Sequence, residues 1–375
     1  MVIAYDGVPV TTHAPRQMFL LVATTLLTLV SACIGLRLLP ALMLPPAALG
    51  FALAVLALPP LLAAGGTLAR ARGNTRLAHR LIWGASLSLG WISSLFILTL
   101  LRELLLAACS WALTAAGFAR IQSESAAAVP ALALLTTLLG LVMALARPRV
   151  LRVRVPIADL PAPLEGFTIV QLSDMHIGPT LHRPYVQAVV DQVNALDADL
   201  VAITGDLVDG TVSDLAPQVA PLAQLRSRHG TFFVTGNHEY YSGASAWIEH
   251  LRSLGVRVLV NEHTVVQHGE ASLIIAGVPD PTVQAFDHRL RSDPALALRG
   301  APAQLRPRIL LAHRPRSAPA AARAGFDLQL SGHTHGGQFW PWNLVIRYQE
   351  PLAIGLDRLE QLWVYTSRGT GFWGP

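Results

Sequence analysis

The sequence predicts an α/β domain that follows an all-α transmembrane domain of about four helices. Three observations support this prediction. Long apolar stretches without charge fill most of the first 150 of the 375 residues. Beyond residue 166, short β-branched runs alternate with helical patterns, which is typical of α/β domains. Five of the strand-like runs end in Asp, Asn or His, and α/β sheets gather their sites at the carboxyl ends of strands.

The N-terminal part contains enough apolar sequence for several membrane spans. Charge-free stretches cover 17–36, 38–69, 81–101, 104–119 and 125–146. About 20 such residues cross the core of a bilayer, so we expect spans near 17–38, 46–66, 81–104 and 126–146. Only Arg102 and Glu103 precede the 104–119 stretch, so it should extend the third helix or lie at the interface. A cleaved signal peptide is excluded because the apolar stretches continue.

Arginine in the loops predicts the orientation of these spans. One cluster lies between the second and third spans, and another follows the fourth: Arg70, Arg72, Arg76 and Arg80, then Arg147, Arg149, Arg152 and Arg154. Loops rich in arginine face the cytoplasm, and the two intervening spans place both clusters on one side. The N-terminus and the C-terminal domain should therefore be cytoplasmic.

The positive charge belongs to the N-terminal part of the chain. Residues 1–150 contain ten arginines and three acidic residues, whereas the remainder contains eighteen basic and twenty acidic residues. A nucleic-acid partner requires a basic face on the active domain, so the charge distribution disfavours one. Cys33 and Cys109 lie in apolar stretches and form neither a disulfide framework nor a thiolate metal site.

The boundary between the two parts is expected at about 147–166. Residues 150–157 alternate apolar side chains with arginine, as an edge strand does, and the Pro161–Pro163 run is typical of a linker. We therefore divide the chain into a multi-pass transmembrane domain (1–150), a linker (151–166) and an α/β domain (167–375).

The α/β domain should contain alternating strands and helices. Strands are predicted at 167–172, 199–204, 231–235, 256–260, 264–268, 271–277, 308–312 and 328–330. Helices are predicted at 183–196, about 214–227 and 244–254, and the Pro- and Ala-rich residues 279–305 should form a loop or cap. This order favours buried sheets with helices around them.

Side chains suited to metal binding follow five of these strands: Asp174, His176, Asp206, Asn237, His313, His333 and His335. Each has an ordinary alternative. Asp206 or Asn237 could cap the next helix, and His313 could be a hydrogen-bonded buried histidine. The ordinary alternatives would require five strands to end in metal-binding residue types by coincidence, so we favour a single polynuclear metal site.

The ligand types indicate the metals and the chemistry. Carboxylate, amide and imidazole ligands without cysteine suit Mn²⁺, Fe or Zn²⁺. Seven ligands exceed the need of one tetrahedral ion and suit two divalent ions about 3.5–4 Å apart, as in two-metal hydrolytic centres. A shared carboxylate would offset the repulsion between the ions, and a hydroxide bridging them would attack phosphorus.

The motifs Asp-x-His, Gly-Asp-x-x-Asp, Gly-Asn-His-Glu, a later His, and Gly-His-Thr-His-Gly-Gly-Gln, in this order, resemble those of the calcineurin-like metallophosphoesterases. The resemblance covers about residues 165–375 and is to the bacterial, membrane-anchored branch, which implies the bacterial inner membrane. It implies a β-sandwich of mixed sheets flanked by helices. Relatives usually continue from the stretch at 369–375 into a final strand, so this strand is missing or the sequence is a fragment.

The resemblance also implies individual roles. One ion would bind Asp174, His176, Asp206 and His335, and the other would bind Asp206, Asn237, His313 and His333. His238 would protonate the leaving oxygen or stabilise the transition state, and Asp209 would orient its imidazole. Arg314 and Tyr240 are candidates for contact with phosphate.

The predicted activity is hydrolysis of a phosphate ester or pyrophosphate bond. The membrane domain favours a membrane-embedded substrate, and the resemblance implies UDP-diacylglucosamine as a concrete example. The charge balance disfavours a nuclease or a cyclic-nucleotide phosphodiesterase. The alternative class is a membrane scaffold or transporter-like protein with a regulatory phosphoesterase domain. Intramembrane charges would indicate transport, but Arg37, Arg102 and Glu103 are few and near span ends.

Overall fold

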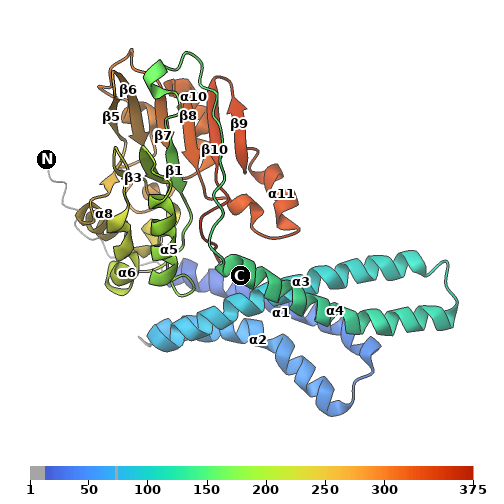
Figure 1. The fold of residues 1–375 in the computed structure, drawn as a ribbon. Helices are drawn as coiled ribbons and strands as arrows, with labels where there is room; N and C mark the ends of the chain where they lie inside the picture. Colours follow the sequence, from blue (N-terminus) through green and yellow to red (C-terminus); the bar gives the residue numbers. More distant parts are fainter. Residues whose placement is uncertain (1–12, 72–74, 375) are drawn as a thin grey trace. The chain divides into compact units, whose positions relative to one another are not determined.

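The computed structural model describes residues 13–71 and 75–374 (Figure 1). They form two compact units, which we call the helical unit, ending at Ala146, and the α/β unit, Arg147–Trp373. Arg72, which contributed to the predicted orientation, lies outside the described residues.

The helical unit consists of four long apolar helices: α1 (His13–Leu42), α2 (Pro46–Ala71), α3 (Thr75–Cys109) and α4 (Ala115–Leu145). Each contains a stretch long and apolar enough to cross a membrane, which agrees with the four expected spans. The 104–119 stretch extends the third helix to Cys109 as predicted. However, α4 begins at Ala115, well before residue 126, because the carboxyl part of that stretch starts a new helix at the N-cap Thr114.

A buried arginine connects three of these helices. Arg102 on α3 is only 4% exposed. Its guanidinium donates to the Gln122 carbonyl at 2.7 Å, to the Ser125 hydroxyl at 2.9 Å and to the Arg37 carbonyl at 3.4 Å. It also pairs with Glu103. Arg37 and Glu103 thus lie beside one buried guanidinium whose donors are satisfied, as burial of a cation requires.

The α/β unit contains two sheets. The first is parallel throughout, in the order β1 (Ile169–Leu172), β2 (Leu200–Ile203), β3 (Thr231–Phe233) and β4 (Arg257–Val258). The second is mixed, in the order β5 (Glu262–His268), β6 (Ala271–Gly277), β7 (Arg308–Leu311), β8 (Leu328–Ser331), β10 (Leu362–Thr366) and β9 (Gly355–Leu359). The α/β sandwich is confirmed, with the difference that only the second sheet is mixed.

Strand β2 explains the layering. Successive strand residues point to opposite faces. Leu200 and Ala202 therefore face the second sheet, whereas Val201 and Ile203 pack against helices, and all four are fully buried. A strand covered on both faces has to be apolar throughout. The strands that precede the predicted ligands are accordingly apolar at most positions, and two polar exceptions, Gln171 in β1 and Gln329 in β8, donate to neighbouring hydroxyl oxygens.

Helices cover the outer faces of both sheets. The helices of this unit are α5 (Arg183–Asn194), α6 (Val212–Val219), α7 (Asn237–Ser242), α8 (Ala244–Ser253), α9 (Pro294–Ala297), α10 (Ala318–Ala324) and α11 (Trp342–Gln349). Short 3-10 turns are η1 (Ala162–Leu164), η2 (Ala220–Gln224), η3 (Pro281–Ala285), η4 (Pro315–Ser317) and η5 (His335–Gly337). The predicted helix at 214–227 is thus shorter and ends in a 3-10 turn.

One expectation about strands is wrong, and two strands were missed. Residues 150–157 form no strand: the carbonyl of Pro156 in this stretch accepts from the Trp363 side chain at 2.9 Å, and the carbonyl of the preceding Pro148 accepts from Gln192 at 3.0 Å. Strands β9 and β10 were not predicted, although Leu362 and Val364 alternate with less buried neighbours, as a strand requires.

We predict that Arg102→Ala destabilises the helical unit by about 1–3 kcal/mol, because two carbonyls and the Ser125 hydroxyl lose their buried donor, whereas Glu103 keeps Arg37 as a partner at 3.5 Å. Thermal unfolding of the full chain in detergent would measure the loss. Arg120→Ala is the matched control, since Arg120 is exposed and pairs with Glu124 one turn away in α4. Equal effects of the two substitutions would contradict this account.

Candidate metal centre

All seven predicted ligands lie where strands β1, β2, β3, β7 and β8 end, and the structure brings them to one edge of the sandwich. Two groups have ligand atoms within 4.8 Å of one another: Asp174, His176 and His335, and Asp206, His313 and His333. Asn237 begins α7, directly after the loop that follows β3. The convergence expected from the strand ends is therefore present in the geometry.

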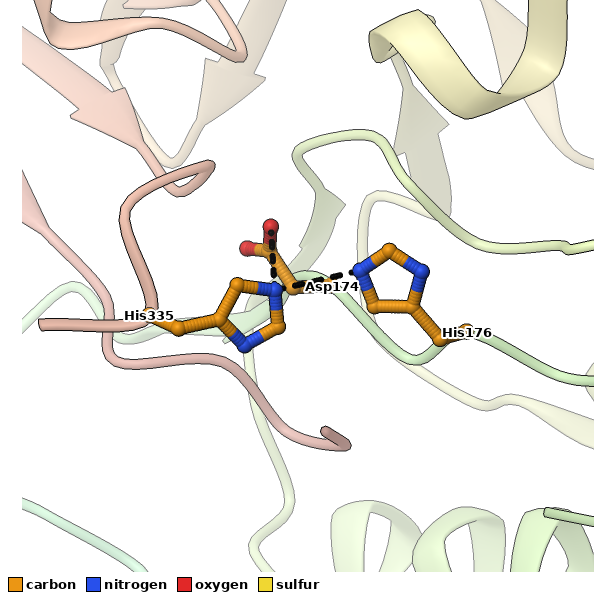
Figure 2. A group of neighbouring side chains, drawn as sticks. All are labelled: Asp174, His176 and His335. Carbon is orange, nitrogen blue, oxygen red and sulfur yellow. Dashed lines mark hydrogen bonds and ion pairs between the residues drawn. The ribbon is translucent and has the colours of Figure 1, made fainter. Parts of the chain in front are cut away.

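The first group joins the two sheets (Figure 2). His335 Nε2, from the loop after β8, lies 3.1 Å from His176 Nε2 and 3.5 Å from Asp174 Oδ1, both from the loop after β1. Two neutral imidazoles can share such a contact only as donor and acceptor. The same atoms are suited to donate lone pairs to one transition-metal ion.

The Asp206 carboxylate belongs to the second group and also lies close to the first. Its Oδ2 is 3.1 Å from His313 Nε2 and 3.9 Å from His176 Nε2. His313 Nδ1 lies 2.8 Å from the Thr204 carbonyl, so in the neutral ring Nδ1 carries the proton and Nε2 is free to act as a ligand. The ring centroids of His313 and His333 are 5.1 Å apart. Asp206 can thus serve both groups.

Several predicted ligands carry buried polar atoms without a hydrogen-bond partner: Asn237 Oδ1, His313 Nε2, His333 Nδ1 and His335 Nδ1. Of these atoms, His313 Nε2 lies 3.1 Å from the Asp206 carboxylate. Buried polar atoms almost always have a partner, and each exception needs an explanation. Lone pairs of this kind on Asn237, His313 and His333 fit divalent cations, whereas His335 offers its other nitrogen, Nε2, to the first group.

The backbone at the predicted ligands is strained. Five of them adopt a left-handed conformation: Asp174 (φ 53°), His176 (φ 47°), Asp206 (φ 50°), His333 (φ 71°) and His335 (φ 50°). Such residues cost about 1–3 kcal/mol each and cluster at functional sites. The surrounding sandwich has to offset this cost.

Two glycines make room for the carboxylates. A Cβ on Gly236 would lie 2.1 Å from Asp206 Oδ1, and one on Gly332 would lie 2.1 Å from Asp174 Oδ2. Both distances are far below van der Waals contact. The main-chain amide of His238 donates to Asp206 Oδ1 at 2.9 Å, and that of His333 donates to Asp174 Oδ1 at 2.9 Å. The carboxylates are therefore held by backbone that a larger residue would displace.

Glu239, which the sequence reasoning assigned no role, anchors the loop that carries Asp206. Its buried carboxylate accepts from the amides of Gly236 at 2.6 Å, Leu207 at 2.8 Å and Asp206 at 3.0 Å. Burial and the nearby Asp206 raise the pKa of Glu239 to about 7. Its position after Asn237 and His238 in the motif was the available signal.

The charges of the centre are strongly coupled. Burial opposes ionisation of Asp206, but the imidazoles of His313, His238 and His176 outweigh it and hold its pKa far below the usual range. Burial alone would lower the pKa of His313, but the surrounding carboxylates, Asp206 first, raise it to about 10. Burial and His313 lower the pKa of His333 to about 3. Since ligation requires neutral imidazole, metal binding would displace the proton of His313.

His238 and Asp209 lie together, as the sequence suggested. His238 Nδ1 is 2.6 Å from Asp209 Oδ1, and the same oxygen is 3.1 Å from His176 Nδ1. Burial raises the pKa of Asp209, but the two imidazoles outweigh it and lower the pKa to about 2. The carboxylate therefore stays ionised and orients both rings. The second contact, to His176, was not foreseen from the sequence.

The two candidates for phosphate contact have other partners. Arg314 donates to Asp280 at 2.8 Å and to Thr282 at 3.1 Å. Tyr240 is buried, with its hydroxyl 3.0 Å from that of Thr235. The neighbouring Tyr241 is 64% exposed, and its ring centroid lies 5.6 Å from that of His238. Tyr241 is therefore better placed than Tyr240 beside the centre.

Comparisons with known proteins agree with this geometry. The model of the calcineurin-like phosphoesterase family matches residues 167–337. A transmembrane protein with metallophosphoesterase domain from Danio rerio is 40% identical over 243 residues, which cover 63% of this chain and 55% of that protein. An uncharacterized metallophosphoesterase from Campylobacter jejuni is 36% identical, over 62% of this chain and 60% of that protein. One from Aquifex aeolicus is 34% identical, over 55% of this chain and 78% of that protein. The chain spans just over half the length of the vertebrate relatives.

We predict that Glu239→Gln lowers the free energy of unfolding by about 1–3 kcal/mol, because an amide nitrogen cannot accept and leaves a buried backbone N–H unpaired. Urea denaturation of the full chain in detergent would measure the change. Glu249→Gln on α8, where the side chain is exposed, should have little effect. An unchanged midpoint for Glu239→Gln would disprove the anchoring role.

We also predict that Gly332→Ala sharply lowers the metal content of the purified protein, because the new methyl group overlaps Asp174 Oδ2 and Ser173 Oγ. Elemental analysis after dialysis against Mn²⁺-containing buffer and desalting would show it. Gly140→Ala is the control, since no atom lies within 4 Å of the added Cβ. Metal content equal to that of the unsubstituted protein would count against the predicted ligand set.

Proposed function

Because this chain belongs to the calcineurin-like phosphoesterase family, we propose that it hydrolyses a phosphate ester or pyrophosphate bond with two divalent cations bound at the strand ends. The observation that carries the proposal is the position of the Asp206 carboxylate, within 3.9 Å of imidazole nitrogens from both groups. A dinuclear centre needs one such shared carboxylate.

The two groups divide the ligands between the ions. Asp174, His176 and His335 would hold one ion and Asn237, His313 and His333 the other, with Asp206 shared. When bound, Mn²⁺, Fe or Zn²⁺ ions supply Lewis acidity that polarises a phosphoryl oxygen and lowers the pKa of water. The chain itself fixes the positions of the ligand atoms. Gly236 and Gly332 leave room for the two carboxylates, and Glu239 anchors the loop that carries Asp206.

His238 is proposed to protonate the leaving oxygen or stabilise charge on it. It is partly exposed, unlike the buried ligands, and its Nε2 lies 3.9 Å from Asp206 Oδ2. Asp209 holds Nδ1, so the proton to be donated lies on Nε2, which faces the centre. The carboxylate also favours the imidazolium form, since its hydrogen bond contributes to a raised pKa of His238 against the effect of burial.

The helical unit supports a membrane-associated substrate. In this proposal residues 1–150 anchor the protein in the bacterial inner membrane, residues 151–166 link the parts, and residues 167–375 hydrolyse substrate in the cytoplasm. A lipid-linked phosphate or pyrophosphate such as UDP-diacylglucosamine has the required chemistry. The alternative, a membrane scaffold or transporter-like protein with a regulatory phosphoesterase domain, would bind metal without turnover.

The test is turnover of the purified full chain with added Mn²⁺, first on an aryl phosphodiester and then on lipid-linked pyrophosphates. We predict that Asp206→Asn loses metal from both positions and about 10²–10³-fold in turnover, on the order of what removal of one key electrostatic group costs. His335→Ala should lose metal from one position only. Bound metal without turnover in the unsubstituted protein would favour the scaffold alternative.

We further predict that His238→Ala retains its metal but loses about 10²–10⁴-fold in turnover on alkyl esters, the contribution of a positioned general acid. Aryl esters with good leaving groups should lose much less, because their oxygen needs no proton. Elemental analysis and rates on both ester types would test this, with exposed His182→Ala as the control. Loss of metal in His238→Ala would contradict the assigned role.

A further inference from the structure

A dense apolar surface follows the predicted ligand His335. Six large side chains between residues 339 and 348 are exposed: Phe339, Trp340, Trp342, Leu344, Val345 and Tyr348. We call them the α11 surface. No residue of α11 is buried. An apolar concentration of this kind on a folded unit marks an interaction surface.

The α11 surface is held in a defined place. At its start, a Cβ on Gly337 would lie 2.5 Å from Asn343 Cα, so the helix packs directly against the turn that carries His335. At its end, Arg316 donates to Glu350 at 2.7 Å and to the Gln349 carbonyl at 3.1 Å. The apolar side chains are therefore presented outward by a fixed helix. In Figure 1, α11 lies at the margin of the α/β unit, beyond β9.

The tether to the helical unit limits the partners available to this surface. The last apolar helix ends at Leu145, and the Pro148 carbonyl already accepts from Gln192 of the α/β unit at 3.0 Å. Three residues of extended chain reach at most about 10 Å. With α4 in a bilayer, the first residues of the α/β unit stay within this distance of the end of α4. The apolar partner nearest to the α11 surface is therefore membrane lipid.

The composition of the surface fits the lipid–water interface. Trp and Tyr prefer this region because their rings are apolar and their N–H or O–H remains hydrated. Residues 339–349 contain Arg347 and no acidic residue, so anionic headgroups would not be repelled.

We propose that the α11 surface inserts into the headgroup region of the membrane in which the helical unit is anchored. Only six residues separate His335 from Trp342, so insertion holds the predicted metal centre at the level of the lipid headgroups. The bilayer contact itself does not depend on catalysis. Its consequence, that the phosphate to be cleaved is presented by the membrane, rests on the proposed hydrolase function.

Spin labels would test the insertion in the full chain, reconstituted in vesicles of phosphatidylcholine and phosphatidylglycerol. Cys33 and Cys109 are first replaced by alanine, and a label is attached to Leu344→Cys. The matched control is Val265→Cys on β5, where the exposed fraction is 42% against 61% for Leu344. We expect oxygen to relax the label at 344 several-fold more than the water-soluble nickel complex does, with the reverse at 265.

Two results would overturn the proposal. Equal, water-like accessibility at 344 and 265 would show that the α11 surface stays in solvent. Spin–spin broadening at 344 that disappears on dilution with unlabelled chain would show that it contacts a second copy. Neither readout requires turnover, so failure of the insertion is distinguishable from failure of the hydrolase proposal.

A second measurement tests whether insertion of the α11 surface helps the protein to reach a substrate embedded in the membrane. The double substitution Leu344→Ser with Tyr348→Ser removes apolar area at the two most exposed positions of the surface. Turnover of a phosphodiester dissolved in water should be unchanged, whereas turnover of a phosphodiester embedded in vesicles should fall about tenfold. Equal rates on the embedded substrate would overturn the link to supply, and Val265→Ser serves as the control.

Discussion

The Asp206 carboxylate can occupy its position only because residue 236 has no side chain, and the rest of the centre depends on this contact. The ends of β2 and β3 approach so closely that a Cβ on Gly205 would also meet the backbone of Gly236, at 2.5 Å. This proximity allows one carboxylate to face imidazoles from both sheets. A wider separation would place the two groups of ligands out of each other's reach.

The sandwich stabilises backbone conformations that are unfavourable on their own. The five left-handed residues follow short strands that pack into the two hydrophobic cores, so the strand ends have little freedom to relax. Glu239 stabilises the same region locally, because its carboxylate accepts from the amide of Asp206 after β2 and from the amide of Gly236 after β3. Because Asp209 similarly joins His176 and His238, the centre is connected through carboxylates as well as through the sheets.

The sequence was informative where function depends on local pattern. Every predicted ligand follows an apolar strand, so the rule that parallel strands end together was sufficient to predict their convergence. Glu239 was missed because its partners at 206 and 207 lie some thirty residues away, and no local pattern shows them. Residues 150–157 have the alternation of a strand, but their neighbouring carbonyls are taken by Gln192 and Trp363. The α11 surface was missed because apolar side chains in a sequence do not reveal whether a fold will cover them.

The short connection between Leu145 and Pro148 changes how the α/β unit meets its substrate. Under the proposed function, in which the helical unit spans a bilayer and the substrate is a lipid-linked phosphate, so short a connection would keep the first residues of the α/β unit close to the layer that contains the substrate. The effective concentration of lipid phosphate near the centre would then be set by the length of the connection and not by binding affinity. A centre in this position can therefore work with weak affinity for the headgroup and still be saturated, which leaves its binding energy for the transition state.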